Sequence, residues 1–304
     1  MQRIDGRPVA PAAAAMRSSA RVGPKGLDRA LRRLVPSTAA LSRGRAFAVA
    51  SRLVDAAVRP FWRLFTDRPV PPLRYIVRTG VGNNILFPPF YYLTVATDQW
   101  LYFFSRGFAT LDSVVVDIGS GVGKSAVPLR DFRYGDRRFE GRYIGYDVDP
   151  EMVAWCSAHF PEDRFRFVHL DRHSSVYNPT GGGGRPRLDC ADAGADFVLS
   201  QSLLSHLLED DVEHYLAESY RVLRPGGALA MTFFCMEDLR RLDLLGGRWS
   251  FAHRMGRAHV ESLRYPEAAV AYEAADILAM CRRIGFGTAR VARPNFQSTL
   301  ECIR

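Results

Sequence analysis

Cysteine pairs and long apolar runs are both missing from this sequence of 304 residues. Its five cysteines are odd in number, widely scattered and never arranged as C-x-x-C. This pattern argues against a disulfide framework or a structural zinc site and favours a reducing, cytoplasmic location. The most apolar stretch, residues 85–104, is broken by two prolines and Asp98, so no run of about 18 apolar residues predicts a membrane-spanning helix. The first residues also lack the continuous apolar core of a secretory signal.

Acidic residues are scarce at the start of the chain. Residues 1–65 hold 13 basic residues against three aspartates, whereas the rest of the chain holds 28 basic and 29 acidic residues, a net charge of −1. The overall charge of +9 therefore belongs to the N-terminal segment. Because a surface that follows nucleic acid phosphates should be basic, we expect no nucleic acid partner for the rest of the chain.

Composition divides the chain into three segments. Residues 1–26 contain few large apolar side chains and are predicted to be a disordered lead. Residues 27–66 interleave arginine with Leu, Val, Phe and Trp at helical spacing, which predicts a basic amphipathic arm. Such an arm can dock on the body of the protein or a partner subunit, make peripheral contact with an anionic membrane, or contact nucleic acid, and the Arg-rich start also resembles an organelle transit peptide. Residues 67–304 are predicted to form the main domain, opening with two short helices.

Strands and helices alternate after residue 112. The predicted strands are residues 113–118, 142–147, 165–170, 196–201 and 228–234, followed by two short strands at 288–292 and 298–303. The predicted helices begin near Gly123, at Pro150 after an N-cap at Asp149, at Glu209 with closure at 225–227, and at Ala271. This alternation predicts an α/β fold with a mostly parallel sheet, helices on both faces and a C-terminal antiparallel hairpin.

Two insertions interrupt the alternation. Residues 172–194 contain four consecutive glycines and are predicted to form a flexible loop in place of most of a helix. Residues 236–266 lie between the fifth strand and the last helix. Long connections at the carboxyl ends of strands are where α/β folds place substrate contacts, so both insertions are candidates for that role.

The stretch VVVDIGSGVGK, residues 114–124, raises the question of which ligand it holds. A P-loop would need glycine at Ile118, and the dinucleotide fingerprint would need its third glycine at Lys124. What remains is an acid, Asp117, at the end of a buried strand, followed by alternate glycines at 119, 121 and 123. Glycines there let a ligand approach the backbone closely, and the acid favours a cationic group. The pattern therefore predicts a ligand with an amino group and a ribose and without phosphates.

Polar residues end the next three strands as well. Asp147 ends the second strand, where a carboxylate can accept hydrogen bonds from both ribose hydroxyls. Asp171 ends the third and can accept from an exocyclic adenine amine, and Ser200 and Gln201 end the fourth. Since ligands lie over the carboxyl ends of strands in an open α/β sheet, these residues are expected to form one site.

The motifs VVDIGSGVGK, YIGYDVDPEMVAWC, FRFVHLD, DFVLSQSLLSHL and ESYRVLRPGG together resemble the class I S-adenosylmethionine-dependent methyltransferases over residues 80–304. YNP, residues 177–179, and SHLLEDDVEHYLAESYRVLRPGGALAMTFF, residues 205–234, look like a bacterial subgroup associated with sugar, glycan or glycolipid methylation. The resemblance implies a Rossmann-like, seven-stranded sheet and S-adenosyl-L-methionine as cofactor. It implies a cofactor site made of Asp117, Gly119, Ser120, Gly121, Gly123, Asp147, Val148, Asp171, Ser200 and Gln201.

The acceptor expected from this resemblance is a small molecule or glycan methylated on oxygen. A sugar hydroxyl benefits from a general base, for which His206 is the first candidate, followed by His173 and Tyr177 and then by His253 and His259. No spacing of His or carboxylate residues supports a metal. A methyltransferase for protein or nucleic acid and a non-catalytic binding module remain the alternatives. The acceptor atom and the oligomeric state do not follow from the sequence.

Overall fold

The computed structural model describes residues 42–64, 66, 68–79, 96–174, 177–246 and 249–304. The predicted disordered lead, residues 1–26, lies outside these described residues, as does the start of the predicted arm. Within the described part, no helix has the length and apolar character needed to cross a bilayer.

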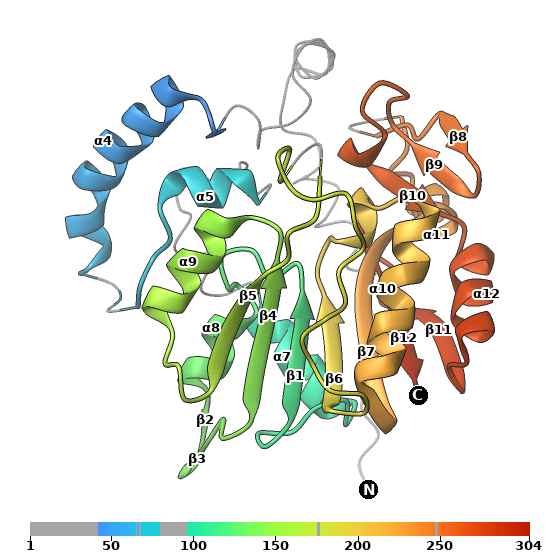
Figure 1. Cartoon of the computed structure of the whole chain (residues 1–304), viewed down its shortest axis with the longest axis horizontal. Coiled ribbons are helices and arrows are strands. Elements are labelled where there is room, and N and C mark those ends of the chain that lie inside the picture. The colour runs from blue at the N-terminus through green and yellow to red at the C-terminus, as the bar shows by residue number, and fades with distance from the viewer. Residues whose placement is uncertain (1–41, 65, 67, 80–95, 175–176, 247–248) are drawn as a thin grey trace, which may run out of the picture.

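A central parallel sheet carries the fold (Figure 1). Five parallel strands run in the order β5, β4, β1, β6, β7, and β12 pairs antiparallel with β7 and with β11. Their bounds are β1 Val114–Ile118, β4 Arg142–Asp147, β5 Phe165–His169, β6 Ala195–Ser200, β7 Leu223–Cys235, β11 Thr288–Ala292 and β12 Ser298–Ile303. The Rossmann-like α/β fold predicted from the alternation is confirmed, including its C-terminal antiparallel hairpin.

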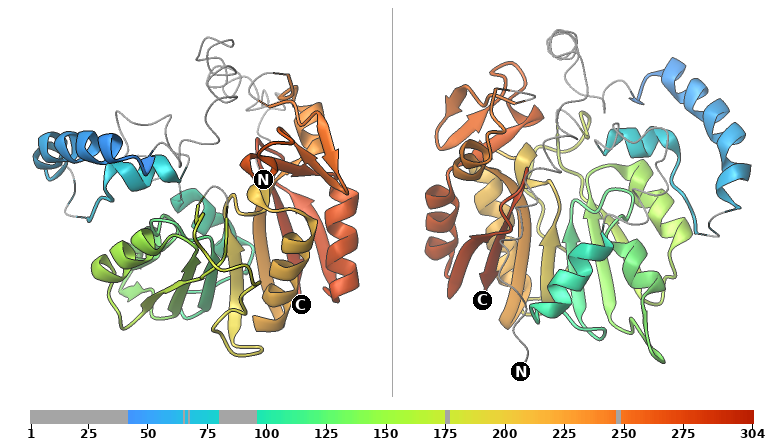
Figure 2. Two further views of the ribbon diagram at one scale, coloured as in Figure 1. Left: turned by 45° about the horizontal axis from the view of Figure 1, so that its top comes forward. Right: turned by 180° about the vertical axis from the view of Figure 1, so that it is seen from behind.

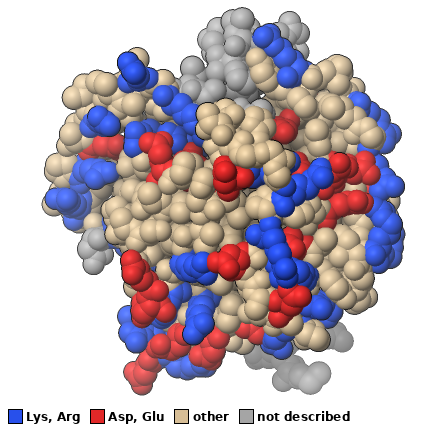
Figure 3. Space-filling view, viewed as in Figure 1, with Lys and Arg blue, Asp and Glu red and all other residues tan. Residues whose placement is uncertain are grey.

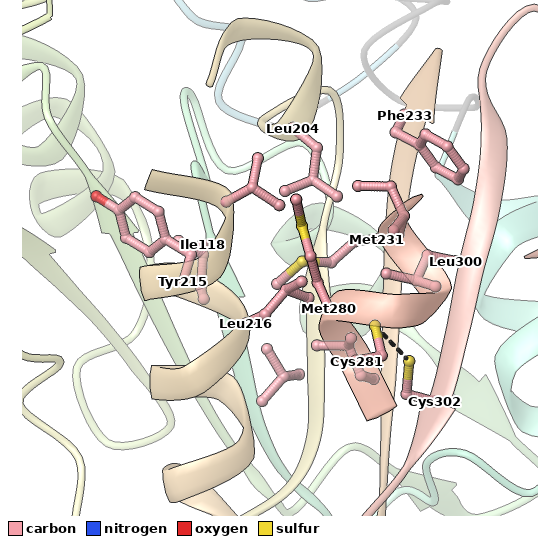
Figure 4. Packing of buried hydrophobic residues seen from close by; sticks show 14 of the residues in the cluster. Ile118, Leu204, Tyr215, Leu216, Met231, Phe233, Met280, Cys281, Leu300 and Cys302 are labelled. Atoms are coloured by element: carbon pink, nitrogen blue, oxygen red, sulfur yellow. Dashed lines mark hydrogen bonds between the residues drawn. The ribbon is translucent and has the colours of Figure 1, made fainter. Parts of the chain in front are cut away.

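Helices cover both faces of the sheet, as Figures 1 and 2 show from three sides. On one face α7 Thr97–Ser105, α8 Ala126–Asp131 and α9 Pro150–His159 share a buried cluster with β1, β4 and β5. On the other face α10 Glu209–Val222 and α12 Ala274–Ile284 share a second cluster with the sheet. In Figure 4 Met231 and Leu300 of the sheet meet Met280 of α12, and the Cys281 and Cys302 sulfurs lie 3.6 Å apart. The strands read as near-continuous apolar runs because both faces are covered.

Local sequence explains where the best-predicted helices begin and end. The Asp149 carboxylate accepts hydrogen bonds from the backbone N–H groups of Glu151 and Met152, and Pro150 occupies the first position of α9, as predicted. The first turn of α10 holds three acids, which its dipole favours. Gly285 ends α12 in the left-handed conformation, with φ at 115°.

Three predicted boundaries and the predicted number of strands need correction. The first helix, α8, begins at Ala126 instead of near Gly123, because the loop of left-handed glycines continues to residue 125. α10 ends at Val222, and residues 225–227 lie inside β7, where the register against β6 jumps and leaves extra residues unpaired. The last helix, predicted to begin at Ala271, begins at Ala274, because Ala271 and Tyr272 belong to strand β10 Val270–Tyr272. The described sheet accordingly has ten strands instead of seven.

The three extra strands belong to the second insertion and the residues after it. β8 His253–Met255, β9 Ala258–Val260 and β10 Val270–Tyr272 form an antiparallel extension, and β10 pairs parallel with the last two residues of β7. The same stretch contains helix α11 Met236–Arg241 and a short 3-10 helix η3 Pro266–Ala268. A separate small hairpin, β2 Arg133–Tyr134 with β3 Arg137–Arg138, lies at the other end of the sheet.

Two helices precede α7 in the described residues. α4 Arg45–Trp62 lies at the edge of the molecule and packs on α5 Leu73–Arg78, which in turn lies over the start of α9 (Figure 1). The first insertion, residues 172–194, contains neither a helix nor a strand among its described residues.

Candidate functional site

The glycine loop leaves the carboxyl end of β1 and turns back on β4. Gly119, Gly121 and Gly123 all have positive φ angles, of 79°, 53° and 72°. The backbone N–H groups of Gly119 and Ser120 donate to the carbonyl oxygen of Tyr146 at 2.7 and 3.0 Å. A Cβ atom on Gly123 would lie 2.9 Å from the ring of Phe160. The loop therefore needs glycine both for its left-handed backbone and for its close packing.

Asp117 lies beneath this loop and is almost fully buried. Its Oδ2 accepts the hydroxyl proton of Tyr143. Burial raises the pKa of the Asp117 carboxyl to about 7, although this hydrogen bond and Lys124 act in the opposite direction. Asp117 Oδ1 and Ser120 Oγ are buried with no hydrogen-bond partner in the described part of the chain. Two unpaired oxygens at the base of a glycine loop fit a ligand that brings N–H or ammonium donors.

Asp147 joins the glycine loop to the end of β4. Its Oδ2 accepts the backbone N–H of Gly121 at 2.7 Å and its Oδ1 accepts that of Asp149 at 2.8 Å. Burial raises the pKa of the Asp147 carboxyl to about 6 against the lowering effect of these two bonds. Val148 follows, and its carbonyl oxygen lies 3.2 Å from Nε2 of His169. Each carboxylate oxygen of Asp147 keeps a lone pair for a further donor such as a hydroxyl.

The remaining predicted cofactor residues differ in accessibility. Asp171 is exposed, and its Oδ1 accepts the N–H of Gly182 at 3.0 Å. Ser200 is buried and donates its hydroxyl proton to the Ile118 carbonyl at 2.6 Å, which ties β6 to β1. Gln201 donates to the side-chain oxygen of Gln99. The Ser200 hydroxyl proton is thus used in a hydrogen bond within the protein and is not available to a ligand. Asp171 and Gln201, in contrast, lie at the accessible end of the sheet.

Two of the five candidates for the general base, Tyr177 and His206, lie side by side. The hydroxyl of Tyr177 lies 3.2 Å from Nε2 of His206, and Nδ1 of His206 lies 2.9 Å from the carbonyl oxygen of Glu267. Because a carbonyl only accepts, Nδ1 carries the ring proton and Nε2 offers its lone pair to Tyr177. Burial lowers the pKa of His206 and raises that of Tyr177, so both groups are neutral near pH 7.

The other histidine candidates are placed differently. His173 is exposed, in the same insertion as Tyr177. His253 is exposed on β8, and the imidazole of His259 lies 3.3 Å from the Glu273 carboxylate, away from the end of β6. The structure therefore brings together His206 and Tyr177 from two distant segments.

Two arginines that the sequence did not single out approach the same region. Arg78 is buried at the end of α5 and donates to Asp149 Oδ2 and Glu151 Oε2, each at 2.7 Å. Arg43, just before α4, donates to Asp149 Oδ2 at 3.2 Å and to the carbonyl oxygen of Tyr177. The N-terminal helices thus contact both the segment after Asp147 and the loop that carries Tyr177. The partners are 71 to 134 residues away in the sequence, so no local pattern could have revealed them.

Uncharged polar side chains gather beyond the end of β6. The Ser202 hydroxyl donates to Oε1 of Gln297 at 2.7 Å, and the Thr232 hydroxyl donates to the same oxygen at 3.1 Å. The backbone N–H of Ser202 donates to the Thr232 hydroxyl at 2.7 Å. Gln99 and Gln201 extend this polar group. Among the described residues, no cluster of His, Cys, Asp and Glu has the arrangement of a metal site.

A parallel sheet with a glycine loop after its first strand and an acid after its second defines the class of nucleoside-binding α/β enzymes. Within that class, residues 116–231 match the family model described as "Methyltransferase domain". This match runs from β1 into β7, the segment that carries the glycine loop, Asp147 and Asp171, and it indicates S-adenosylmethionine as the cofactor. The unpaired oxygens of Asp117 and Ser120 fit the ammonium group of this cofactor, and Asp147 fits a ribose.

Two curated relatives are methyltransferases, and a solved structure shares the fold. The chain is 30% identical over 160 residues to an arsenite methyltransferase of Aquipseudomonas alcaligenes, covering 48% of this chain and 43% of that protein. It is 28% identical over 129 residues to a malonyl-[acyl-carrier protein] O-methyltransferase of Hahella chejuensis, covering 42% and 39%. The chain thus spans less than half the length of these curated relatives. A Nostoc punctiforme structure described as a candidate O-methyltransferase shares the fold, with a TM-score of 0.50, 13% identity and coverage of 75% of this chain and 60% of that one.

Proposed function

We propose that this protein is an S-adenosylmethionine-dependent methyltransferase that methylates a hydroxyl group of a saccharide, a glycolipid or a related small molecule. The observation that carries the proposal is the paired Tyr177 and His206, 3.2 Å apart, with the imidazole held as the tautomer whose Nε2 accepts a proton. An alcohol needs a proton acceptor as it attacks, whereas a neutral amine does not. A buried, neutral histidine meets that need.

The chain's own residues divide the work between alignment and proton transfer. When bound, S-adenosylmethionine supplies an electrophilic methyl group. The Tyr177 oxygen accepts the proton of the acceptor hydroxyl while its own proton passes to Nε2 of His206, so the proton ends on the imidazole. The carbonyl oxygen of Glu267 accepts from Nδ1 and stabilises the resulting imidazolium. We assign Asp147 to the ribose, Asp171 to the adenine, and the loop of Gly119, Gly121 and Gly123 to the methionine half.

The polar group beyond β6 supports a sugar-like acceptor. Gln99, Gln201, Ser202, Thr232 and Gln297 offer amides and hydroxyls without a net charge, which match the alternating donors and acceptors of a polyol. The net charge of −1 outside the first 65 residues gives no basic surface for nucleic acid.

Transfer of labelled methyl from S-adenosylmethionine into separated lipid, polysaccharide, protein and nucleic acid fractions tests the proposal. We expect label in the lipid or polysaccharide fraction with the wild-type protein, and little with Asp147→Ala or His206→Ala. Label confined to protein or nucleic acid would overturn the acceptor assignment. Binding of S-adenosylmethionine without transfer to any fraction would instead identify a non-catalytic binding module.

A further inference from the structure

Helix α4 is attached to the molecule by one face. Ser51, Asp55 and Trp62 are its buried residues. The Asp55 carboxylate accepts the backbone N–H of Leu73, with N–O distances of 3.1 and 3.2 Å to its two oxygens. Because Leu73 is the first residue of α5, this contact fixes how α4 is rotated about its own axis. The opposite face of α4 therefore points away from the sheet (Figures 1 and 2).

The outward face of α4 is apolar. Ala46, Val49, Leu53 and Ala57 follow one another at intervals of three or four residues, which places them in one row along the helix. The Leu53 side chain is 69% exposed, and Leu64 just beyond the helix is 78% exposed. Of the ten large apolar side chains exposed in the described residues, five lie between positions 49 and 64. A cluster of exposed apolar side chains on one helix indicates an interaction surface, because exposed apolar residues are normally scattered singly over a protein.

A row of arginines borders the apolar row. Arg45, Arg52 and Arg59 recur at intervals of seven residues, and Arg63 follows; all four are exposed. The one acid of α4, Asp55, is on the buried side. Basic side chains and uncharged surface share the edge of the molecule where α4 lies (Figure 3). Between α4 and α5 a hollow of about 300 Å³ is lined by Arg52, Arg59 and Arg74 together with Asp55, Ala56 and Pro72.

We propose that α4 docks in the plane of a membrane surface that contains anionic phospholipids. The row of Ala46, Val49, Leu53 and Ala57 enters the boundary between headgroups and acyl chains, and the arginines contact lipid phosphates. The charge of this surface favours an anionic membrane as the partner, because α4 and Arg63 present four arginines and no exposed acid to a layer of lipid phosphates. The hollow lined by Arg52, Arg59 and Arg74 offers their guanidinium groups to one headgroup phosphate.

Vesicle sedimentation with the full-length protein tests this proposal without relying on methyl transfer. We expect binding to vesicles of phosphatidylcholine mixed with phosphatidylglycerol, weak binding to phosphatidylcholine alone, and release by salt. Leu53→Ser should weaken binding about tenfold, since one leucine is removed from the apolar boundary. Arg52→Gln should weaken it about fivefold, since one cation is lost at the headgroups.

Leu263→Ser provides the matched control. Leu263 is 60% exposed, similar to Leu53, but lies between β9 and η3 on the side of the molecule away from α4. It should bind vesicles like the wild type. Absence of wild-type binding to anionic vesicles, or equal binding by Leu53→Ser, would overturn the proposal. A change from dimer to monomer in Leu53→Ser, measured by sedimentation without lipid, would also overturn it and assign the face to a second copy of the chain.

Discussion

Asp147 is the residue for which we expect the largest effect on cofactor binding. Asp147→Ala removes an acceptor for the ribose hydroxyls and the two bonds that hold the Gly121 and Asp149 N–H groups. Affinity for S-adenosylmethionine should fall about 10- to 100-fold, the cost of one hydrogen bond to a charged group. Isothermal titration calorimetry measures this directly. An unchanged dissociation constant would show that the ribose assignment is wrong.

The same carboxylate predicts how cofactor affinity depends on pH. The pKa of Asp147 is raised to about 6 in the free protein, and a ligand that hydrogen-bonds to the ionised form lowers that pKa. The ammonium group likewise lowers the pKa of Asp117, which is about 7 in the free protein, so binding releases protons from both carboxyls. Affinity should therefore decline as the pH falls through about 7 and then about 6. Asp163→Ala, on an exposed turn, should follow the wild-type curve.

His206 makes a separate prediction for the chemical step. Because burial lowers its pKa below the usual 6.5, the turnover number at saturating cofactor should be constant above that pH and fall only in more acidic solution. His206→Asn should lose this acidic limb and reduce the turnover number by about 100-fold or more. Tyr177→Phe should give a comparable loss, because the proton reaches His206 through the Tyr177 hydroxyl. His159→Asn, on the exposed side of α9, should leave the profile unchanged. A wild-type profile in His206→Asn would exclude it as the base.

Gly123 tests the packing of the loop. Gly123→Ala places a Cβ 2.9 Å from Phe160 on a backbone with φ of 72°. We expect the free energy of unfolding to fall by about 2–4 kcal/mol, from left-handed strain and overpacking together. Gly135→Ala has a φ of 59° but nothing within 4 Å, so it should cost only the strain, about 1–2 kcal/mol. Equal losses in urea titrations would show that the Phe160 contact is readily relieved.

At the scale of elements, Arg78 holds α5 on the start of α9. Arg78→Leu would leave Asp149, whose side chain is 2% exposed, without its nearest cation, and should destabilise the protein by about 3 kcal/mol. Arg138→Leu breaks a pair with Glu140 in which both side chains are half exposed, so it should destabilise the protein much less, because solvent screens the pair. Urea unfolding of both variants checks the comparison. A loss below about 1 kcal/mol in Arg78→Leu would mean that Arg43 alone satisfies Asp149.

The sequence predicted those elements whose signals are local. The apolar runs at β1 and β4 and the Asp149-Pro150 start of α9 each identify their element within a few residues, and the structure confirms them. β10 escaped prediction because its three residues belong to a strand only through pairing with β7 and β9. Pairing between distant segments leaves no local pattern.

The candidate site was likewise predictable only where the signal is local in the sequence. Strand ends locate Asp117 and Asp147 because parallel strands bring their carboxyl ends together. The contact between Tyr177 and His206 and the position of Gln297 depend on how an irregular insertion and the β11–β12 hairpin fold over that edge. The sequence identified His206 and Tyr177 as separate candidates for the general base. It could not predict that their side chains lie in contact or which nitrogen of His206 carries the proton.

At the scale of the whole molecule, charge is distributed unevenly between the N-terminal segment and the rest of the chain. The first 65 residues carry the positive excess, whereas the remainder, including the site, is near neutral. A neutral acceptor should therefore bind with a KM that changes less than about twofold between low and high salt, because no counterions are released. An acceptor held through several phosphates would instead lose about 1,000-fold or more in affinity over a fourfold rise in salt. Steady-state kinetics across a salt series distinguishes the two, provided that the labelled acceptor is first separated from anionic phospholipids, because salt also releases the protein from an anionic membrane. Steep loss would reassign the acceptor to nucleic acid and make the arginines of the N-terminal segment its binding surface.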